Sequence, residues 1–318
     1  MSLLDVRALN IFFQSSSTPV QVVSDLSFRI GESEVFGLAG ESGCGKSITA
    51  LSIMGILPQN AFATGQILFK GKDFATLGEE SRRRLRGNEI SMVFQEPMTS
   101  LNPVLTAGYQ VAEVLMTHRG MSRRDAMDRA VELLASVKIP SPEIRVREYP
   151  HQMSGGMRQR VMIAMAIACN PSLLIADEPT TALDVTIQAQ ILELIQRLRE
   201  ERKMSILLIT HDLGVIAENA ARVGIMYAGR LMELAATGEL FGNPLHPYTK
   251  GLLGSLPGAK GTPLSPIAGT VPRPEDFPPG CKYQGRCPEA RPECSAEEPG
   301  LIEVSPGHFV RCSWVIRR

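Results

Sequence analysis

The stretch GESGCGKS, Gly40 to Ser47, decides the fold of this 318-residue chain. It fits the pattern G-x-x-x-x-G-K-[ST] and stands between an apolar segment that begins near Leu38 and the helical pattern ITALSIMGIL. The glycines let successive backbone N–H groups turn inward around an anion, and the following helix adds unpaired N–H groups and the positive end of its dipole. This order predicts a phosphate-binding loop in an α/β fold.

The residue types in the loop suggest individual roles. We expect Lys46 to reach the β- and γ-phosphates of a nucleotide and the Ser47 hydroxyl to bind Mg²⁺. Cys44 is expected to be a small spacer within the loop. The predicted nucleotide-binding residues here are Gly40, Ser42, Gly43, Cys44, Gly45, Lys46, Ser47 and Ile48.

Polar residues also end other strand-like runs. The run LLIADE delivers Asp177 and Glu178 at a strand end, where α/β folds carry their chemistry. Asp177 can hold Mg²⁺ through its water shell, and Glu178 can orient or deprotonate the attacking water. Gln95 ends another such run and could sense both Mg²⁺ and that water, while His211 could hydrogen-bond the γ-phosphate. Together these residues predict phosphoryl transfer to water.

The rest of the chain shows three kinds of pattern. Short apolar runs such as NEISMVF, PSLLIA and KMSILLIT are typical of buried parallel strands, and helical patterns lie between them. From about Pro97 to Gln152 the pattern becomes wholly helical, including a helix that begins at Ser122 with Asp125 three residues later. Beyond Phe241 the composition changes: twelve of the 22 prolines and four of the six cysteines lie in the last 72 residues. These patterns predict an α/β core, a helical insertion and a loop-rich appendage.

Composition excludes several classes of protein. Lysine and arginine (33) balance aspartate and glutamate (33), so no global electrostatic footprint for nucleic acid is present. The basic run Ser81 to Arg86 is expected to be a solvated helix face. The longest apolar run, Val161 to Cys169, has nine residues, against the ~20 that a membrane-spanning helix needs. Without a span or a secretory signal, the chain is expected in the cytoplasm, meeting a membrane only through a partner.

The complete motif set resembles a known family. In order, the chain carries the phosphate loop, FQEP (Phe94 to Pro97), SGGMRQR (Ser154 to Arg160), LLIADEP, TTALD and ITHD. This set resembles the ATP-binding subunit of ABC transporters over roughly residues 5 to 240. The resemblance implies a RecA-like core with an antiparallel β edge region, an ATPase domain over residues 1–240 with a helical subdomain at about 98–157, and a small cysteine-containing C-terminal domain over 241–318.

The resemblance also explains why a second glycine turn opens a helix at Ser154. In the family, two such subunits pack head to tail, and each Ser-Gly-Gly turn closes over the ATP held by the other subunit. Ser154, Gly155 and Gly156 would then form an anion site whose ligand comes with the partner. By the same likeness Asp184 lies at the dimer seam, and Phe13, or alternatively Phe12, stacks on the adenine. Gln95 and the helical insertion would couple nucleotide state to a membrane partner.

Longer matches indicate a branch of the family. FQEPMTSLNP, MAIACNPSLLIADEPTTALDVTIQAQI and HPYTKGLLGSLPG resemble the dipeptide/oligopeptide importer branch, which also includes nickel importers. This implies a second ATPase subunit (identical or homologous), two membrane permease subunits, an external solute-binding protein and a place on the cytoplasmic face of the cell membrane. Peptide is the expected solute, with nickel or another solute as the alternative.

Four cysteines mark the appendage: Cys281, Cys287, Cys294 and Cys312. A reducing cytosol disfavours disulfides, and four thiolates suit either zinc or an iron–sulfur cluster. The spacing matches neither a short zinc knuckle nor a ferredoxin. The resemblance to peptide importers, including RCP at Arg286 to Pro288, favours a [4Fe–4S] cluster with a structural role. Cys169 is expected in the core and His308 on a surface loop.

Two other function classes compete with the importer ATPase. A soluble ABC-type ATPase acting on nucleic acid or ribosomes would carry a long insertion between the phosphate loop and the Ser-Gly-Gly turn, or two ATPase units, and neither occurs here. A regulatory binding module without turnover is disfavoured because Glu178 and His211 are both present.

Overall fold

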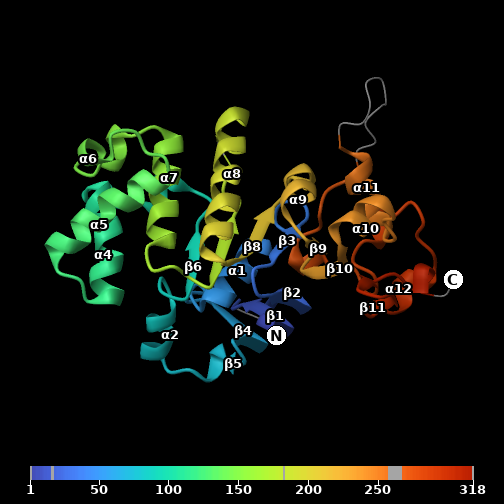
Figure 1. Ribbon diagram of the computed structural model, residues 1–318. Helices are drawn as coiled ribbons and strands as arrows, with labels where there is room; N and C mark the ends of the chain where they lie inside the picture. Colours follow the sequence, from blue (N-terminus) through green and yellow to red (C-terminus); the bar gives the residue numbers. More distant parts are fainter. Residues whose placement is uncertain (1, 16–17, 182, 257–266, 317–318) are drawn as a thin grey trace. The chain divides into compact units, whose positions relative to one another are not determined.

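The computed structural model describes residues 2–15, 18–181, 183–256 and 267–316, and the chain divides into two compact units (Figure 1). Unit 1 contains residues 1–75 and 208–318, and unit 2 contains residues 76–207. Strand β8 (Ser205–Thr210) carries the chain from unit 2 into unit 1. Pro257 and Gly258, at the end of the predicted HPYTKGLLGSLPG motif, lie outside the described residues.

Unit 1 combines two sheets with short helices. Its N-terminal segment contains β1 (Ser2–Phe13), β2 (Val20–Gly31), β3 (Val35–Ala39), α1 (Lys46–Met54), β4 (Ala61–Phe69), β5 (Lys72–Asp73) and the 3-10 helix η1 (Phe74–Thr76). After β8 follow α9 (Leu213–Asn219), β9 (Arg222–Tyr227), β10 (Arg230–Ala236), α10 (Thr237–Gly242), α11 (Pro247–Gly254), η3 (Pro274–Asp276), η4 (Gln284–Arg286), α12 (Glu293–Ala296), β11 (Ile302–Ser305), β12 (His308–Val310) and α13 (Ser313–Ile316).

The first sheet of unit 1 is antiparallel, with strand order β2–β1–β4–β5. Leu4, Val6, Leu9 and Ile11 of β1 are buried; the two-residue spacing within each pair is that of a strand, and the three-residue step from Val6 to Leu9 coincides with an irregularity in the pairing with β2. The sheet supplies the antiparallel β region that the resemblance predicted.

The second sheet of unit 1 has the strand order β11–β12–β10–β9–β3. All five residues of β3 are buried, and β3 runs parallel to β9. Gly37 lets helix α9 approach this strand, since a Cβ there would lie 2.7 Å from a methyl of Ile216. Strand β3 leads directly into the phosphate-binding loop and thereby fixes its position.

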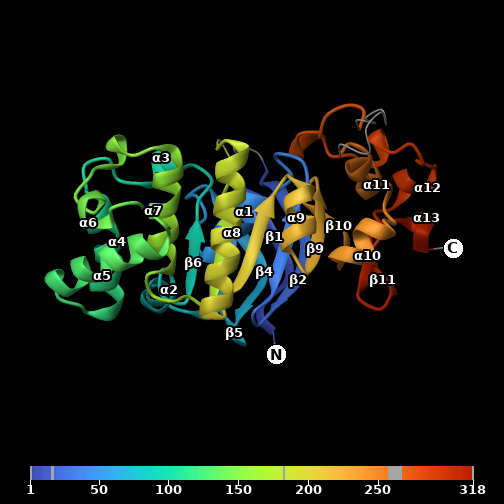
Figure 2. The same ribbon diagram turned by 45° about the horizontal axis from the view of Figure 1, so that its top comes forward.

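The segment after α10 is the C-terminal extension, residues 243–316 of the described chain. Figure 2 shows its short elements α11, α12, α13 and β11 gathered beyond strand β10. Strand β12 pairs with β10, with Glu233 opposite Val310, and β11 pairs with β12. The described helices of the extension have at most eight residues, as the density of prolines predicted.

A buried carboxylate joins this extension to β10. Glu233 is fully buried, and its two oxygens accept hydrogen bonds from the backbone N–H groups of Leu245 (2.8 Å) and His246 (2.9 Å). His308 Nε2 lies 2.7 Å from the same carboxylate. His308 is only 1% exposed, so its predicted place on a surface loop is wrong. The residues around it in the sequence gave no sign of this buried polar partner.

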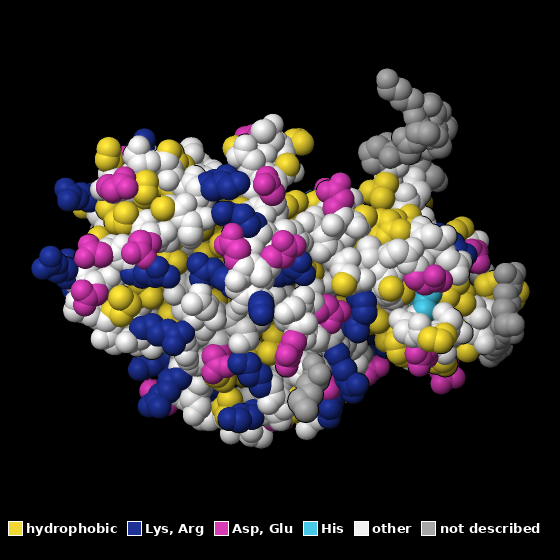
Figure 3. All heavy atoms as spheres, viewed as in Figure 1, with side chains coloured by type: hydrophobic (Ala, Val, Ile, Leu, Met, Phe, Trp, Pro, Cys, Tyr) yellow, Lys and Arg dark blue, Asp and Glu magenta, His cyan; other side chains and the backbone are white. Residues whose placement is uncertain are grey.

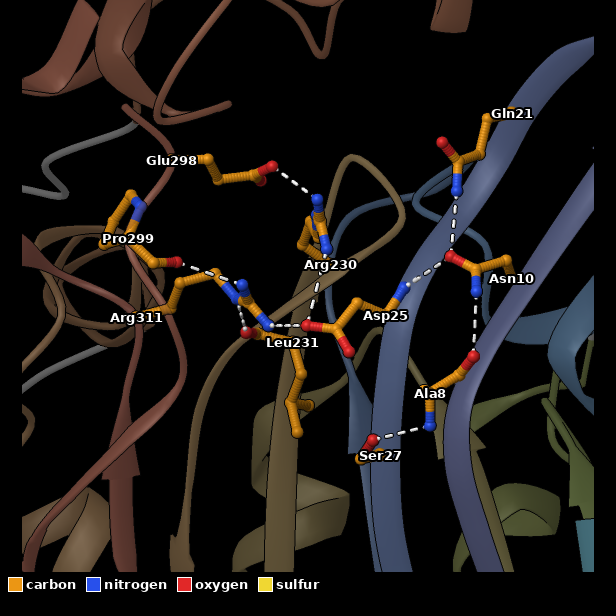
Figure 4. Close-up of polar contacts among 10 residues, drawn as sticks. All are labelled: Ala8, Asn10, Gln21, Asp25, Ser27, Arg230, Leu231, Glu298, Pro299 and Arg311. Atoms are coloured by element: carbon orange, nitrogen blue, oxygen red, sulfur yellow. Dashed lines mark hydrogen bonds and ion pairs between the residues drawn. The ribbon is translucent and has the colours of Figure 1, made fainter. Parts of the chain in front are cut away.

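A second polar cluster holds the end of the extension (Figure 4). The guanidinium of Arg311, itself buried, donates to the carbonyl oxygens of Leu231 and Pro299 and to Asp25 Oδ2 at 3.1 Å. Arg230 pairs with Asp25 and with Glu298. Strand β2, strand β10 and the extension therefore meet at one carboxylate, Asp25.

Unit 2 is mainly helical. It contains α2 (Glu79–Leu85), β6 (Ile90–Val93), α3 (Pro97–Ser100), α4 (Ala107–Arg119), α5 (Arg123–Ser136), α6 (Pro142–Arg145), η2 (Pro150–Gln152), α7 (Gly155–Ile167), β7 (Leu173–Asp177) and α8 (Val185–Arg202). Strands β6 and β7 are parallel, with Ile90 opposite Leu173.

Helix α7 is the centre of unit 2, because it packs against α3, α4, α5, α8 and β6. Its buried side chains include Gln159, whose amide donates to the carbonyl oxygen of Pro179 (2.7 Å), and Arg160, which donates to that of Val137 (2.8 Å). Ser122 caps α5 by accepting a hydrogen bond from the Asp125 N–H, as predicted. Figure 1 shows α4, α5 and α6 grouped beside α7, which agrees with a helical insertion.

The surface carries mixed charge. Figure 3 shows basic and acidic side chains interspersed over the face in view. Arg82, Arg83 and Arg84 of α2 pair with Glu79 and Glu80, so the basic run is a solvated helix face whose charge these two carboxylates partly offset. Among the described residues, no helix is both long and apolar enough to cross a membrane.

We predict that Glu233→Gln lowers the free energy of unfolding by about 1–3 kcal/mol, because the amide keeps one acceptor but turns the other into a donor that faces N–H groups. The measurement is urea unfolding followed by circular dichroism. Glu218→Gln, on the exposed face of α9 in the same unit, is the matched control and should change stability by less than about 0.5 kcal/mol. Equal effects of the two variants would contradict the structural role of Glu233.

Candidate nucleotide-binding site

The phosphate-binding loop requires glycine at two positions. Gly40 has φ +151°, and a Cβ there would lie 2.1 Å from the carbonyl oxygen of Met226. Gly45 has φ +104°, and its Cβ would lie 3.0 Å from a methyl of Val23. Real Cβ atoms do not tolerate the first contact, so only glycine allows β3 to turn sharply into α1 at this point.

Lys46 lies inside the loop rather than on its surface. It is 4% exposed, and its ammonium donates to the carbonyl oxygens of Gly40 (2.8 Å) and Glu41 (3.0 Å). Cys44 is buried beneath it, with Sγ 3.6 Å from Nζ, and burial raises the pKa of this thiol. Ser42 and Gly43 are exposed at the tip, while Ser47 and Ile48 are half-buried in the first turn of α1. The tip of the loop, Ser42 and Gly43, is therefore exposed to solvent, and the Lys46 ammonium is buried behind it.

Sequence reasoning missed the side chain of Glu41. Its carboxylate forms a bidentate ion pair with Arg286 of the extension, at 2.7 and 2.9 Å, and its backbone N–H donates to the Tyr248 hydroxyl at 3.1 Å. These partners are more than two hundred residues away in the sequence. The RCP and HPY stretches that contain them indicate a family branch but give no sign of these contacts.

In unit 2 the acidic pair ends strand β7. Asp177 and Glu178 are buried, and Glu178 has φ +45°. A non-glycine residue in this left-handed region is uncommon and often marks a functional site. One oxygen of Glu178 accepts hydrogen bonds from Gln95 Nε2 (3.0 Å) and Thr181 Oγ1 (2.8 Å). The structure thus brings Gln95 and Glu178 together, and it adds Thr181, which the sequence did not single out.

The Ser-Gly-Gly turn is also in unit 2. Ser154 is the N-cap of α7, where its hydroxyl accepts from the Met157 N–H, and Ser154 and Gly155 are both exposed. Gly156 packs close to Ile187 of α8. Asp184 caps α8 by accepting from the Ile187 N–H at 2.9 Å. The adjacent Val185 is 81% exposed. This edge of unit 2 combines an open helix N-terminus with an exposed apolar side chain.

The remaining predicted residues lie in unit 1. Phe12 stacks on Phe62 of β4, with ring centroids 5.1 Å apart. Phe13, at the end of β1, does not take part in this stack, which favours Phe13 over Phe12 as the predicted adenine contact. His211 is exposed directly after β8. Phe13, the phosphate loop and His211 are therefore in unit 1, while Gln95, Asp177, Glu178, Ser154 to Gly156 and Asp184 are in unit 2. The meeting of both sets around one nucleotide stays a prediction.

The four cysteines of the extension line one small cavity of about 20 Å³, together with His246, Tyr283 and Trp314. All four are free thiols, and burial raises the pKa of Cys281 and of Cys287 to about 11. Within the ranges that the structure describes, no group of three or more His, Cys, Asp or Glu side chains is arranged to hold a metal ion. The iron–sulfur prediction therefore gains no support from the observed arrangement.

Comparison with known proteins identifies the class. The family model "ABC transporter" matches residues 23–181, and the model "Oligopeptide/dipeptide transporter, C-terminal region" matches residues 232–294. Solved ATP-binding cassettes have the same fold: the dimeric cassette MJ0796, bound to ADP and Pi, gives a TM-score of 0.66 at 27% identity, covering 74% of this chain and 98% of that one. The cassette cbiO1 from Clostridium perfringens gives 0.63 at 26% identity, covering 76% and 91%. The chain belongs to the ABC transporter family of ATP-binding proteins, and the predicted phosphate-loop α/β fold is confirmed.

Relatives that match over nearly their full length indicate the branch. The oligopeptide transport ATP-binding protein AppD of Bacillus subtilis is 51% identical over 98% of this chain and 96% of its own. The dipeptide transport ATP-binding protein DppD of the same organism is 49% identical, with 97% and 93% covered. DppD of Haemophilus influenzae is also 49% identical, with 98% and 95% covered. Within the family, this chain groups with the oligopeptide and dipeptide transport ATP-binding proteins.

The cap of α7 gives a stability prediction. Ser154→Ala should lower the free energy of unfolding by about 1 kcal/mol because the Met157 N–H loses its acceptor, whereas Ser154→Asp should keep the cap and the stability. Urea unfolding of both variants is the measurement. If Ser154→Asp is as unstable as Ser154→Ala, the capping role is wrong.

Proposed function

We propose that this chain is the ATP-hydrolysing subunit of an ABC importer for dipeptides or oligopeptides. The observation that carries this proposal is the near-complete coverage of peptide transport ATP-binding proteins at about half identity, with the C-terminal region included. The intact phosphate loop, Gln95, Glu178 and His211 support turnover rather than passive binding. Residues 1–240 would form the ATPase domain, with its helical part at about 98–157, and residues 241–318 the C-terminal domain that contains the extension.

Each site residue then has a role in phosphoryl transfer. The inward-facing amides of the loop and the Lys46 ammonium bind the β- and γ-phosphates, and Ser47 and Asp177 would hold Mg²⁺, which neutralises developing charge when bound. Glu178 orients the attacking water and accepts its proton, while Gln95 and Thr181 fix the carboxylate through their hydrogen bonds. His211 contacts the γ-phosphate. Positioning and electrostatic stabilisation supply most of the rate.

The active site would be completed by a second subunit. Ser154 and Gly155 are exposed at the start of α7, and no phosphate ligand for them is predicted within the chain. We infer that they cap the γ-phosphate of ATP bound to an identical or homologous partner, with Asp184 at the seam. The solved MJ0796 cassette is a dimer, which supports an assembly of two subunits. Two permease subunits would anchor the pair at the cytoplasmic face of the membrane, with an external binding protein delivering the solute.

Glu178→Gln tests this mechanism. We expect ATPase activity to fall at least about a hundredfold, since the amide cannot accept the proton of the attacking water, while ATP binding persists and a closed dimer accumulates. Malachite-green assays and light scattering with Mg-ATP are the measurements. Adding Ser154→Asp, which keeps the cap but places a negative charge against the partner's phosphate, should abolish the dimer. A Glu178→Gln variant with an unchanged rate would contradict the assignment.

Uptake of solute decides the substrate. Cells without this chain should lose uptake of a labelled di- or tripeptide, and the unaltered chain, but not Glu178→Gln, should restore it. Loss of nickel uptake with normal peptide uptake would instead favour the nickel alternative and overturn the peptide proposal.

The cysteine cavity would hold a metal group. The four cysteines that line this cavity supply thiols, which are the donor type of a [4Fe–4S] cluster and of zinc, although the described side chains are not arranged around a metal ion. His246 also lines this cavity; its Nδ1 accepts from the Tyr248 N–H, and its Nε2 is buried without a hydrogen-bond partner among the described residues. We propose a [4Fe–4S] cluster held by Cys281, Cys287, Cys294 and Cys312, with a structural role.

Anaerobic purification tests the cluster. We expect about four iron and four sulfide per chain and a brown absorbance that disappears when iron is chelated, with a fall in the thermal unfolding midpoint. Cys287→Ser should lose the colour, whereas Cys169→Ser, outside the cavity, should keep it. A colourless protein with one zinc per chain would replace the cluster with the zinc alternative.

A further inference from the structure

The phosphate-binding loop is tied to the cysteine-bearing extension at one residue, Glu41. Its carboxylate accepts two hydrogen bonds from the Arg286 guanidinium, Nη1 to Oε2 at 2.7 Å and Nη2 to Oε1 at 2.9 Å. The Arg286 and Glu41 side chains are only 7% and 28% exposed. A bidentate, largely desolvated pair of this kind fixes both distance and orientation.

Arg286 is also held in place by groups outside the loop. It donates to the carbonyl oxygens of Ala268 (2.8 Å) and Gly269 (3.2 Å), and its guanidinium lies 5.7 Å from the ring centroid of Tyr227. It also precedes Cys287, one of the four cysteines that line the cysteine cavity. The extension and β9 therefore fix the position of the Arg286 guanidinium.

A second contact fixes the backbone of the same residue. The Tyr248 hydroxyl, from helix α11, accepts the Glu41 N–H at 3.1 Å. Tyr248 is fully buried and packs against Tyr227 and Tyr283, with ring centroids 4.8 and 5.2 Å away. The Glu41 carbonyl oxygen accepts from Lys46. Every polar group of Glu41 thus has a partner, so this residue anchors the loop and leaves phosphate contacts to its neighbours.

The charges explain why an anchor is needed here. Glu41 places a carboxylate within a loop whose function is to bind a polyanion. Without a paired cation, this half-buried carboxylate would repel the phosphates, since little solvent screens the interaction. The Arg286 guanidinium removes that repulsion, and burial of the pair keeps salt from replacing it.

We propose that Arg286 is a positioning residue for the phosphate-binding loop, through which the cysteine-bearing extension sets the affinity of the ATPase for Mg-nucleotide. With Tyr248, it holds Glu41 in the conformation that leaves the remaining loop amides facing the phosphates. The inference rests on the proposed nucleotide site and holds for either metal group in the cysteine cavity.

The test is a cycle of variants of the full chain, titrated with Mg²⁺ and mant-ADP, a fluorescent nucleotide. Arg286→Gln should weaken binding about fivefold to twentyfold, because it leaves the Glu41 carboxylate unpaired beside the phosphates. Glu41→Gln should bind within about threefold of the unaltered chain. The double variant Glu41→Gln/Arg286→Gln should recover most of the loss, and Arg286→Lys, which keeps the charge without the bidentate geometry, should be intermediate.

Arg230→Gln is the matched control, because it breaks a different partly buried ion-pair network between the extension and the rest of unit 1, that with Glu298 and Asp25 (Figure 4). Arg230→Gln should lower the unfolding midpoint about as much as Arg286→Gln does. Its affinity for mant-ADP should stay within about twofold of that of the unaltered chain. The inference is overturned if Arg286→Gln binds like the unaltered chain, if the double variant is weaker than Arg286→Gln, or if Arg230→Gln weakens binding equally. Failure of the unaltered chain to bind mant-ADP would overturn the nucleotide site as well.

Discussion

The turn between β3 and α1 is the constraint on which the rest of the structure depends. Backbone amides bind phosphate only if the chain reverses within a few residues. That reversal brings Gly40 so close to β9 that a Cβ on it would lie 2.1 Å from the Met226 carbonyl oxygen. Strand β9, which contains Met226, must therefore lie in fixed register beside β3. The buried residues of β3 and the packing of α9 over Gly37 maintain that register, so the core of unit 1 supports the geometry of one loop.

Much of the fold follows from local sequence. The phosphate loop, the runs that become β6, β7 and β8, and the capped helix at Ser122 are all recognisable because period, length and turn chemistry are properties of neighbouring residues. The candidate chemical groups are recognisable for the same reason: Asp177 and Glu178 end an apolar run, and Ser154 opens a helix. Spacing alone does not show that these groups act together. The assignment to a family of ATP-binding proteins indicates that they all serve a nucleotide site.

The contacts that fix those groups were not predictable, because they depend on tertiary packing and mostly join residues far apart in the chain. Thr181 beside Glu178, Tyr248 and Arg286 at Glu41, and Glu233 beside His308 are the examples. His308 shows the difficulty most clearly. A histidine in a stretch rich in glycine and proline suggests an exposed loop, and only the pairing of β12 with β10 buries it against a carboxylate. The positive φ of Glu178 likewise has no signature in sequence.

The position of β12 has a consequence for any shortened form of this protein. Strand β10 carries the apolar residues Leu231, Met232 and Leu234, and its outer hydrogen-bonding groups are occupied by β12. Beyond β12, the sheet ends at β11, a strand of four exposed residues that includes the acidic Glu303. Removal of the extension would thus replace a short, charged border with a longer apolar one, open to strands of other molecules. The extension therefore covers an edge of β10 that would otherwise be open to pairing with another chain.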